Sequence, residues 1–273
     1  MFKRSPLKSQ VMQKKRRRIL ALRLFLLVLC GGGLIALFLS ISKLDSFIIT
    51  NITISGNKAV TESVLRAIVE THLEKKYMNV VPRNNALTLP RRAIATEILA
   101  TFPVIEYAAL SLNNLTSMIL RVTERVPYVL WCQKNMLNEC YLADRTGFIF
   151  APSPEFSNDI YLRFRNDERE NPIGTYILDK KMFNALSYEI ENLRSLSIFP
   201  IEVAIDDKEF ELITRDYKIV FDTSKSFEEI FSNLKIVIEK DGSLRRALTT
   251  RGALDYIDLR YGNKVFYRLK KPD

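Results

Sequence analysis

Few side chains in this sequence have the chemistry of a nucleophile or a metal ligand. His72 is the only histidine, and the cysteines are Cys30, Cys132 and Cys140. A Cys–His nucleophile would need His72 to meet Cys132 or Cys140 from a distant part of the chain. His72 falls among apolar residues at helical spacing, which favours a partly buried structural role. A metal site is not predicted, because seven residues separate Cys132 from Cys140 and no histidine lies near them.

Cys132 and Cys140 flank the polar stretch Q-K-N-M-L-N-E, which is typical of a hairpin loop. In an oxidising compartment the two thiols can pair across the hairpin as a disulfide. Disulfide geometry is strict, and the spacing in the sequence does not fix the register of the two strands. A Cys132–Cys140 disulfide and a pair of free thiols therefore both remain open at this point.

Paired carboxylates are the other candidates for chemistry, as a general acid and a general base. The pairs are Asp206 with Asp207, Glu228 with Glu229, and Asp255 with Asp258. The first two are typical of a solvated turn and a helix face, and residues three apart on a strand face opposite sides. No G-x-S-x-G, S-x-x-K, Walker or H-E-x-x-H string occurs. We interpret the chain as a non-enzyme without cofactor, metal or small-molecule substrate. An anchored cell-wall hydrolase or transferase with unrecognised catalytic residues is a competing interpretation.

The elements that position these residues fall into two groups, of which the first covers residues 47–125. The sequence predicts a strand over residues 47–57, a helix capped by Thr61, a helix with Pro90 in its first turn, and strands over residues 104–112 and 116–124. Apolar side chains recur at helical spacing in the two helices, at Val64, Leu65, Ile68, Val69, Ile94, Ile98 and Leu99. This order predicts a small α+β unit with two helices on one face of a sheet. It resembles a POTRA domain (β-α-α-β-β), a module that binds other chains.

Residues 126–270 form the second group, in which short strands alternate with helices. We expect helices over about 179–195, from a cap at Ser226 to about 240, and over about 243–250. The closing stretch from Tyr256 to Leu269 alternates apolar and polar residues around Gly262-Asn263, which predicts a terminal strand pair. The region is expected to form a mainly antiparallel β domain with flanking helices. The fold class of the chain is therefore α+β.

The net charge of +10 is concentrated in the first residues of the chain. Residues 1–23 hold nine Lys and Arg side chains and no acid, whereas the remaining 250 residues hold 32 basic and 31 acidic ones. A nucleic-acid-binding body would need a basic face of its own. We therefore expect no nucleic acid among the partners, and we interpret residues 1–23 as a basic cytoplasmic tail.

Residues 24–41 carry no charge, and a start at Ile19 would lengthen this apolar stretch. It is long enough to cross about 30 Å of hydrocarbon as a helix. We interpret it as an uncleaved transmembrane helix; a signal peptide cleaved near Ser40-Ile41-Ser42 is the alternative. The nine basic residues before the span place the N-terminus in the cytoplasm and the bulk of the chain outside it. The expected location is the cytoplasmic (inner) membrane.

Three strings resemble passages of the FtsQ/DivIB family of bacterial cell-division proteins. R-V-T-E-R-V-P-Y-V-L-W, Arg121 to Trp131, is similar to the V-x-E-R-x-P-x-A-x-W passage between the two extracytoplasmic domains of the family, with Val129 in place of the alanine. Y-L-A-D-R-T-G-F-I-F resembles the family's L-V-D-x-x-G-x-V-F hairpin. Y-I-D-L-R-Y-G-N-K-V resembles its closing V-D-L-R-Y-x-x-G-x-A-V, with a shorter turn. The tail, the span, the POTRA-like unit and the β domain also follow the family's order.

The resemblance implies a non-catalytic bitopic scaffold of the divisome, which acts at the division site in septum formation during the cell cycle. Such proteins link early and late division proteins and bind small bitopic partners of the FtsB and FtsL type. Other divisome proteins would contact the POTRA-like domain. The alternative function is a membrane-tethered POTRA-type chaperone or assembly factor for envelope proteins. Tandem POTRA repeats or a C-terminal barrel would favour that alternative, and neither pattern occurs.

The resemblance also assigns partner-binding residues, because in the family the closing segment borders the surface where an FtsB-like partner adds a strand. We expect a partner strand to pair along Val265 to Leu269, with Tyr261 and Tyr267 as side-chain anchors. Arg260 is expected to meet an acid of the partner. The competing interpretation is a terminal hairpin whose tyrosines pack on the protein's own core.

Overall fold

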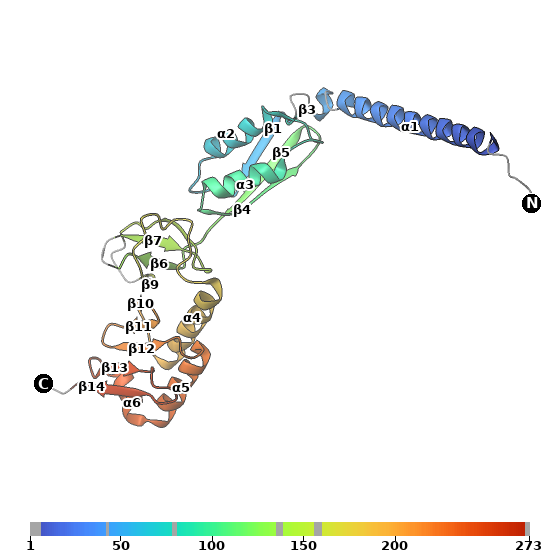
Figure 1. Cartoon of the computed structure of the whole chain (residues 1–273). Helices are drawn as coiled ribbons and strands as arrows, with labels where there is room; N and C mark the ends of the chain where they lie inside the picture. The colour runs from blue at the N-terminus through green and yellow to red at the C-terminus, as the bar shows by residue number, and fades with distance from the viewer. Residues whose placement is uncertain (1–6, 42–43, 78–80, 135–138, 156–159, 271–273) are drawn as a thin grey trace, which may run out of the picture. The chain divides into compact units, whose positions relative to one another are not determined.

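The computed structural model describes residues 7–41, 44–77, 81–134, 139–155 and 160–270. This part of the chain has an α+β fold that includes a large mixed sheet (Figure 1). The chain divides into two compact units, Met1–Thr101 with Tyr107–Thr123, and Phe102–Glu106 with Glu124–Asp273. The division after Thr123 lies close to residue 125, where the sequence places a domain boundary. The inclusion of Phe102–Glu106 in the second unit has no counterpart in the sequence prediction.

Helix α1, Leu7–Ile41, is longer than the predicted span of residues 24–41. It runs through much of the basic segment, because Lys, Arg, Leu and Ala all have high helix propensities. The part from Lys15 to Ile41 is long and apolar enough to cross a membrane, and many of its apolar side chains are exposed. Residues 1–6 of the predicted tail and Ser42 of the alternative cleavage site lie outside the described residues.

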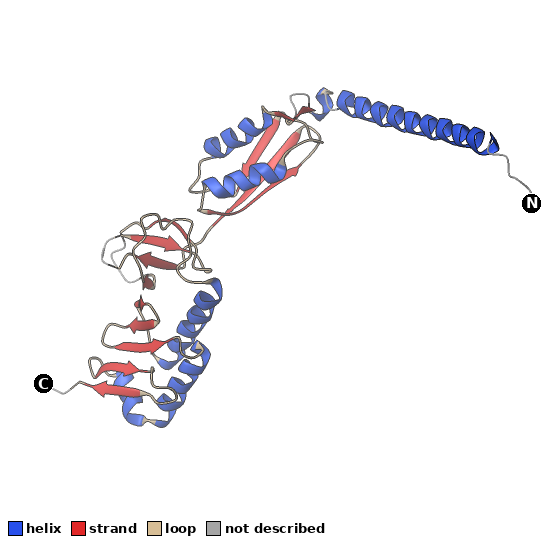
Figure 2. Cartoon of the chain, viewed as in Figure 1, coloured by secondary structure: helices blue, strands red, loops and turns tan. Residues whose placement is uncertain are grey.

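In the first unit, helices pack on a three-stranded sheet with the strand order β1-β5-β4 (Figure 2). Its elements are β1, Asn51–Ser55; α2, Glu62–Leu73; α3, Arg91–Thr101; β4, Ile105–Leu112; and β5, Ser117–Glu124. Strands β1 and β5 are parallel, with Ile54 opposite Leu120. Parallel neighbours need a long connection between them, and here it includes both helices and β4.

The core of the first unit lies between its helices and its sheet. Leu65, Ile94 and Ile98 are fully buried, as the helical spacing predicts. Val64 and Leu99, which the same spacing assigned to the apolar face, are exposed to 44% and 37%. Each of them adjoins a fully buried position, so the buried stripe of each helix is narrower than the sequence prediction.

The starts of the two helices differ in detail from the predictions. Thr61 is the N-cap of α2, but its hydroxyl lies 3.2 Å from Ser63 Oγ and makes no capping hydrogen bond. Pro90 precedes α3 instead of lying in its first turn. Between the helices the structure has a hairpin, β2, Lys76–Tyr77, and β3, Val81–Pro82, that was not predicted. Strands of two residues are too short to show a pattern of alternation.

Gly56 follows the last residue of β1 and has a φ of +89°. A Cβ atom on this residue would lie 2.0 Å from the carbonyl oxygen of Val122 in β5. That oxygen belongs to the backbone of the central strand, so it cannot move aside without disturbing the sheet. The close approach and the positive φ together explain why glycine stands here.

The second unit contains a mixed sheet, which has nine strands in the described part of the chain (Figure 1). The strand order is β14-β13-β12-β11-β10-β9-β6-β7-β8. The strands are β6, Val129–Cys132; β7, Cys140–Ala143; β8, Ile149–Pro152; β9, Arg163–Arg165; β10, Glu202–Asp206; β11, Glu209–Ile213; β12, Lys218–Asp222; β13, Leu254–Asp258; and β14, Phe266–Leu269.

Three neighbouring pairs of this sheet are parallel, namely β6 with β9, β9 with β10, and β12 with β13. The sheet is therefore mixed. Its five other neighbouring pairs are antiparallel, so it remains mainly antiparallel, as the sequence predicts. Strand β9 is followed by α4, Lys180–Leu193, before β10, and β12 by α5, Phe227–Lys240, and α6, Gly242–Thr249, before β13. A helical crossover returns the chain in the same direction, and this makes the strands on either side of it parallel.

One core joins the helices of the second unit to its sheet. Phe183 and Leu186 of α4 and Leu234 of α5 are fully buried in the same cluster as Phe210 and Phe221 of the sheet. Side chains alternate between the two faces of a strand, so Glu209 and Glu211 of β11 lie on the face opposite the buried Phe210 and Leu212. Ser226 is the N-cap of α5 as predicted and accepts a hydrogen bond from Glu229 N. Asp179, near the predicted start of α4, is its N-cap and accepts a hydrogen bond from Lys181 N.

A buried ion pair holds the start of the second unit. The guanidinium of Arg125 lies 2.5 Å from a carboxylate oxygen of Asp144, donates to the Pro103 carbonyl, and stacks 4.2 Å from the Phe148 ring centroid. Asp144 is buried, and its other oxygen accepts hydrogen bonds from Thr146 and from Phe148 N. Burial alone would raise the pKa of Asp144, but the hydrogen bonds from Thr146, Phe148 N and Arg125 outweigh it and lower that pKa.

Candidate functional site

The two edge strands of the nine-stranded sheet, β8 and β14, differ in what covers their outer sides. At the β8 edge, Ile149 exchanges backbone hydrogen bonds with Gly174 and Thr175, so a loop covers this strand at its first residue. At the other end, β14 pairs with β13, with Phe266 opposite Asp258 and Tyr267 opposite Ile257. Within the described residues, no backbone group bonds to the outer side of β14. Its outward N–H and C=O groups are therefore available to another strand.

Three apolar side chains are exposed at this free edge, and we call them the edge patch: Tyr261, Phe266 and Leu269. Their exposed fractions are 57%, 48% and 45%. The rings of Tyr261 and Phe266 pack edge to face, with their centroids 5.2 Å apart. Tyr261 is thus exposed, as a partner-binding side chain must be. Phe266 was absent from the residues that the sequence assigned to the site, although it lies within the stretch of alternation.

Tyr267 and Val265, also expected at the site, are placed differently from Tyr261. Both are half-buried and pack against the core of the second unit. The hydroxyl of Tyr267 donates a 2.6 Å hydrogen bond to Asp241, and this bond raises the pKa of Tyr267. The ring of Tyr267 therefore lies on the inner face of β14, while the backbone of the same residue remains part of the free edge.

Arg260 lies in the turn before the free edge and is paired with acids of its own chain. Its guanidinium is 2.6 Å from Asp258 and 2.7 Å from Glu209. Hydrogen bonds to these two carboxylates raise the pKa of Arg260. Hydrogen bonding from Arg260 in turn outweighs burial and lowers the pKa of Asp258. Arg260 therefore needs no acid from a partner to be neutralised.

Basic side chains surround the edge patch. Lys264, Arg268 and Lys270 are exposed in or next to β14. Arg268 is paired with Asp255 and lies 4.9 Å from the centroid of the Tyr256 ring, while Lys270 donates to the Asp216 carbonyl. Asp255 is the acid paired with Arg268, and Lys264 and Lys270 add positive charge at the edge, which would suit an added strand with apolar and acidic side chains.

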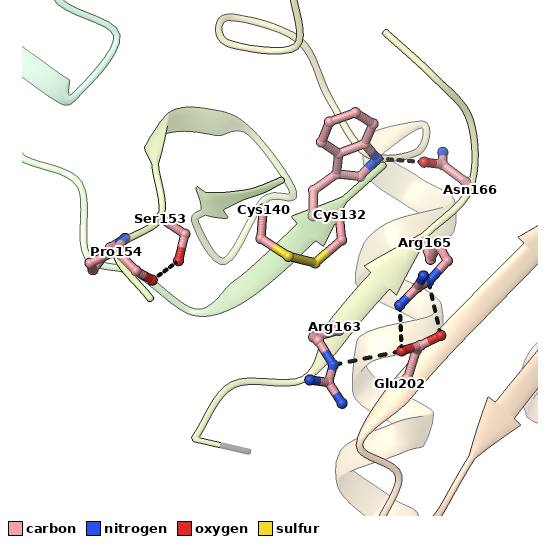
Figure 3. The surroundings of a disulfide bond; sticks show 9 residues. Cys132, Cys140, Ser153, Pro154, Arg163, Arg165, Asn166 and Glu202 are labelled. Atoms are coloured by element: carbon pink, nitrogen blue, oxygen red, sulfur yellow. Dashed lines mark hydrogen bonds and ion pairs between the residues drawn. A yellow bond between two sulfur atoms is a disulfide. The ribbon is translucent and has the colours of Figure 1, made fainter. Parts of the chain in front are cut away.

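Cys132 and Cys140 are joined by a disulfide in the structure (Figure 3). They are directly opposite each other in β6 and β7, the register that the sequence left open. Arg163 and Arg165 lie on the neighbouring strand β9, and Figure 3 shows both directed toward Glu202. Arg165 binds Glu202 through two hydrogen bonds of 3.0 Å. The disulfide thus joins β6 to β7, and the bidentate ion pair joins the next two strands, β9 and β10.

Removing the disulfide is expected to lower the free energy of unfolding by about 2–3 kcal/mol, since the bond restricts the unfolded chain between two cysteines eight residues apart. Urea titrations of wild type and of the Cys132→Ala/Cys140→Ala variant, followed by the fluorescence of Trp131, measure this difference. Reductant should shift the unfolding midpoint of the wild type and leave that of the variant unchanged. A wild-type midpoint that does not respond to reductant would contradict the prediction.

The residues considered for catalysis are dispersed. His72 is buried in α2, and its Nε2 lies 2.6 Å from Glu97 in α3. Asp206 is paired with Lys134, and Asp207 occupies the turn between β10 and β11 with a φ of 54°. Glu228 and Glu229 lie in the first turn of α5. Across the described residues, no group of three or more His, Cys, Asp or Glu side chains is placed to hold a metal ion.

No protein-family model matches the chain, and no curated protein matches it.

Proposed function

We propose that this protein is a non-catalytic, single-pass scaffold of the bacterial division machinery, of the FtsQ/DivIB type. The three strings that resemble this family fall at the junction between the two units and at two strand pairs of the second unit. R-V-T-E-R-V-P-Y-V-L-W runs from β5 into β6, Y-L-A-D-R-T-G-F-I-F covers β7 and β8, and Y-I-D-L-R-Y-G-N-K-V leads from β13 to β14. The strings therefore coincide with a junction between units and with two hairpins, which supports the resemblance.

The first unit acts in this proposal as a POTRA-like domain. Its strand, helix, helix, strand, strand order and its three-stranded sheet support this assignment, with β2 and β3 as an addition between the helices. Helix α1 is the membrane anchor, and its basic start places the N-terminus in the cytoplasm and the two units outside it. The protein would then work at the division site of the inner membrane.

The observation that carries the proposal is the free edge of β14. An extended segment of a partner can add a strand there, with backbone hydrogen bonds for affinity and side-chain contacts for specificity. The edge patch offers two aromatic rings, and the neighbouring cations favour acidic residues in the partner. Bitopic proteins of the FtsB and FtsL type are the proposed partners. Tyr261 and Phe266 are the proposed anchors, and Tyr267 contributes backbone groups and fixes the strand.

Truncation of either anchor is expected to weaken partner binding by about 30-fold or more, since hot-spot residues contribute ~2 kcal/mol or more. The measurement is the affinity of purified full-length Tyr261→Ala and Phe266→Ala forms for the FtsB-type protein of the same genome. Tyr188→Ala is the matched control, because Tyr188 is exposed to 64% but lies in α4. Its affinity should equal that of the wild type.

Unchanged affinity in both anchor variants, with their folds intact by circular dichroism, would remove β14 from the proposed site. In dividing cells, a fluorescent fusion of the intact chain should gather at midcell. Diffuse fluorescence around the envelope would contradict the division function and would favour the chaperone alternative.

A further inference from the structure

The side chain of Asp241 joins the edge strand to the helical layer. One carboxylate oxygen of Asp241 caps α6, accepting hydrogen bonds from Ser243 N at 2.8 Å and Leu244 N at 3.3 Å. The other oxygen accepts the hydroxyl of Tyr267 at 2.6 Å. A single carboxylate therefore fixes the first turn of a helix and the inner side of β14.

The hydrogen bond from the Tyr267 hydroxyl to Asp241 is charge-assisted. The pKa of Asp241 is lowered, chiefly by the hydrogen bond from Tyr267, and the pKa of Tyr267 is raised by the same bond. At neutral pH the Asp241 carboxylate is thus ionised and the Tyr267 hydroxyl keeps its proton. A hydrogen bond to an ionised acceptor is stronger than one between two neutral groups.

A second contact holds the turn that leads into β14. Lys225, just before α5, donates to the side-chain oxygen of Asn263 at 2.6 Å and also pairs with Glu229. Strand β14 has four residues and a single neighbouring strand. Short edge strands of this kind open most easily, so contacts from the helical layer decide how well the strand is ordered.

We infer that Asp241 is a positioning residue, which holds β14 in one register against β13 before a partner arrives. A partner that adds a strand to an ordered edge loses less free energy in ordering than one that meets a frayed edge. The role of this order in docking rests on the proposed function, whereas the order of β14 itself is a property of the free protein.

Asp241→Ser separates the two functions of the carboxylate. Serine is a good N-cap, so α6 keeps its cap, but serine has one side-chain oxygen and cannot also accept from Tyr267. Tyr267→Phe removes the same hydrogen bond from the other side and retains the ring. The matched control is Asp179→Ser, because Asp179 caps α4 through bonds to Lys181 N and Met182 N and has no contact with β14.

The first measurement is hydrogen exchange of residues 264–270 in the free full-length protein. Loss of one charge-assisted hydrogen bond is expected to speed exchange by about tenfold in Asp241→Ser and in Tyr267→Phe. The double variant should be no faster than either single variant, because all three lack the same bond. Asp179→Ser should exchange like the wild type. Unchanged exchange in both test variants, or equal acceleration in Asp179→Ser, would overturn the inference and leave the proposed function standing.

The second measurement is the affinity of the same variants for the FtsB-type protein of the same genome. Both test variants should bind about tenfold more weakly, in step with their faster exchange. Faster exchange with unchanged affinity would show that the order of β14 does not assist docking. That result would overturn the docking role of Asp241 and leave the proposed site standing. The site itself fails only if Tyr261→Ala and Phe266→Ala bind like the wild type, so the two failures are distinguishable.

Discussion

Replacement of Arg125 by methionine is expected to lower the free energy of unfolding of the second unit by about 3–5 kcal/mol. The reason is the carboxylate that remains, because Asp144 is buried and would keep a negative charge without its cation. Methionine retains an unbranched apolar side chain, and the guanidinium that lies over the Phe148 ring is lost together with the charge. Urea titration followed by the fluorescence of Trp131, which is fully buried in the same unit, measures the change.

Two further variants test this reason for the loss. Lys218→Met removes the cation of an exposed pair with Glu211 and should cost less than about 1 kcal/mol. Adding Asp144→Asn to Arg125→Met should restore part of the stability, because asparagine carries no charge and still accepts from Thr146 and Phe148. Equal costs for Arg125→Met and Lys218→Met would contradict the prediction.

The Arg125–Asp144 pair also has a defined pH dependence. The pKa of Asp144 in the folded protein is lower than the value near 3.9 of an unfolded chain. Its contribution to stability is therefore complete above about pH 4 and is lost as the pH falls through the folded-state pKa. The stability difference between wild type and Arg125→Met/Asp144→Asn should narrow in that acidic range.

Replacement of Gly56 by alanine is expected to destabilise the first unit by about 3 kcal/mol or more. Two effects add, namely the strain of a side chain at a φ of +89° and a Cβ atom placed 2.0 Å from the Val122 oxygen. Relief of the overlap would require β1 and β5 to separate, and these strands are the parallel pair of that sheet. Hydrogen exchange of residues 62–73 and 117–124 in the full-length protein reports the stability of this unit.

Gly174→Ala separates the two effects. Gly174 has a φ of +90°, but a Cβ atom on it would have nothing within 4 Å. This variant should show only the backbone strain, about 1–2 kcal/mol in the second unit. A cost at Gly56 equal to that at Gly174 would show that the sheet accommodates the extra atom, and the contact with Val122 would then not explain the glycine.

The sequence predicts where helices and strands lie better than it predicts which strands pair in the sheet. The cap at Ser226 and most of the buried face of each helix follow from local patterns and agree with the structure. The parallel pairs do not follow from such patterns, because pairing of β9 with β10 joins segments separated by α4. Alternation carries no information about which distant strand lies alongside, so the sequence supported only the general expectation of a mainly antiparallel domain.

The terminal strand shows a second limit of sequence reasoning. Alternation defines two faces of β14 but does not say which face meets the core. Phe266 and Tyr267 are both aromatic, so their polarity does not decide the question. The structure decides it through the position of Asp241, a residue outside the stretch of alternation, which accepts from Tyr267 and leaves Phe266 exposed.

The role of Arg125 was likewise not readable from its own neighbourhood. The resemblance drew attention to the string that contains it, but the acid it pairs with, Asp144, lies in the turn between β7 and β8. The two strings R-V-T-E-R-V-P-Y-V-L-W and Y-L-A-D-R-T-G-F-I-F are thus physically connected through one ion pair. Such a pairing becomes visible only when both strings are placed in space.

The two edges of the nine-stranded sheet differ in how readily another copy of the chain could add to them. A sheet with two open edges can propagate, with each added copy offering a new edge to the next, and this leads to ribbons and fibres. Here, within the residues that the structure describes, the segment that contains Gly174 and Thr175 bonds to the outer side of β8 at Ile149. Two copies joined through β14 would leave β8 as the outer strand on both sides, and the bonds at Ile149 would hinder further addition there. A partner strand and a second copy would compete for the same position on β14, which would couple the stoichiometry of the complex to protein concentration.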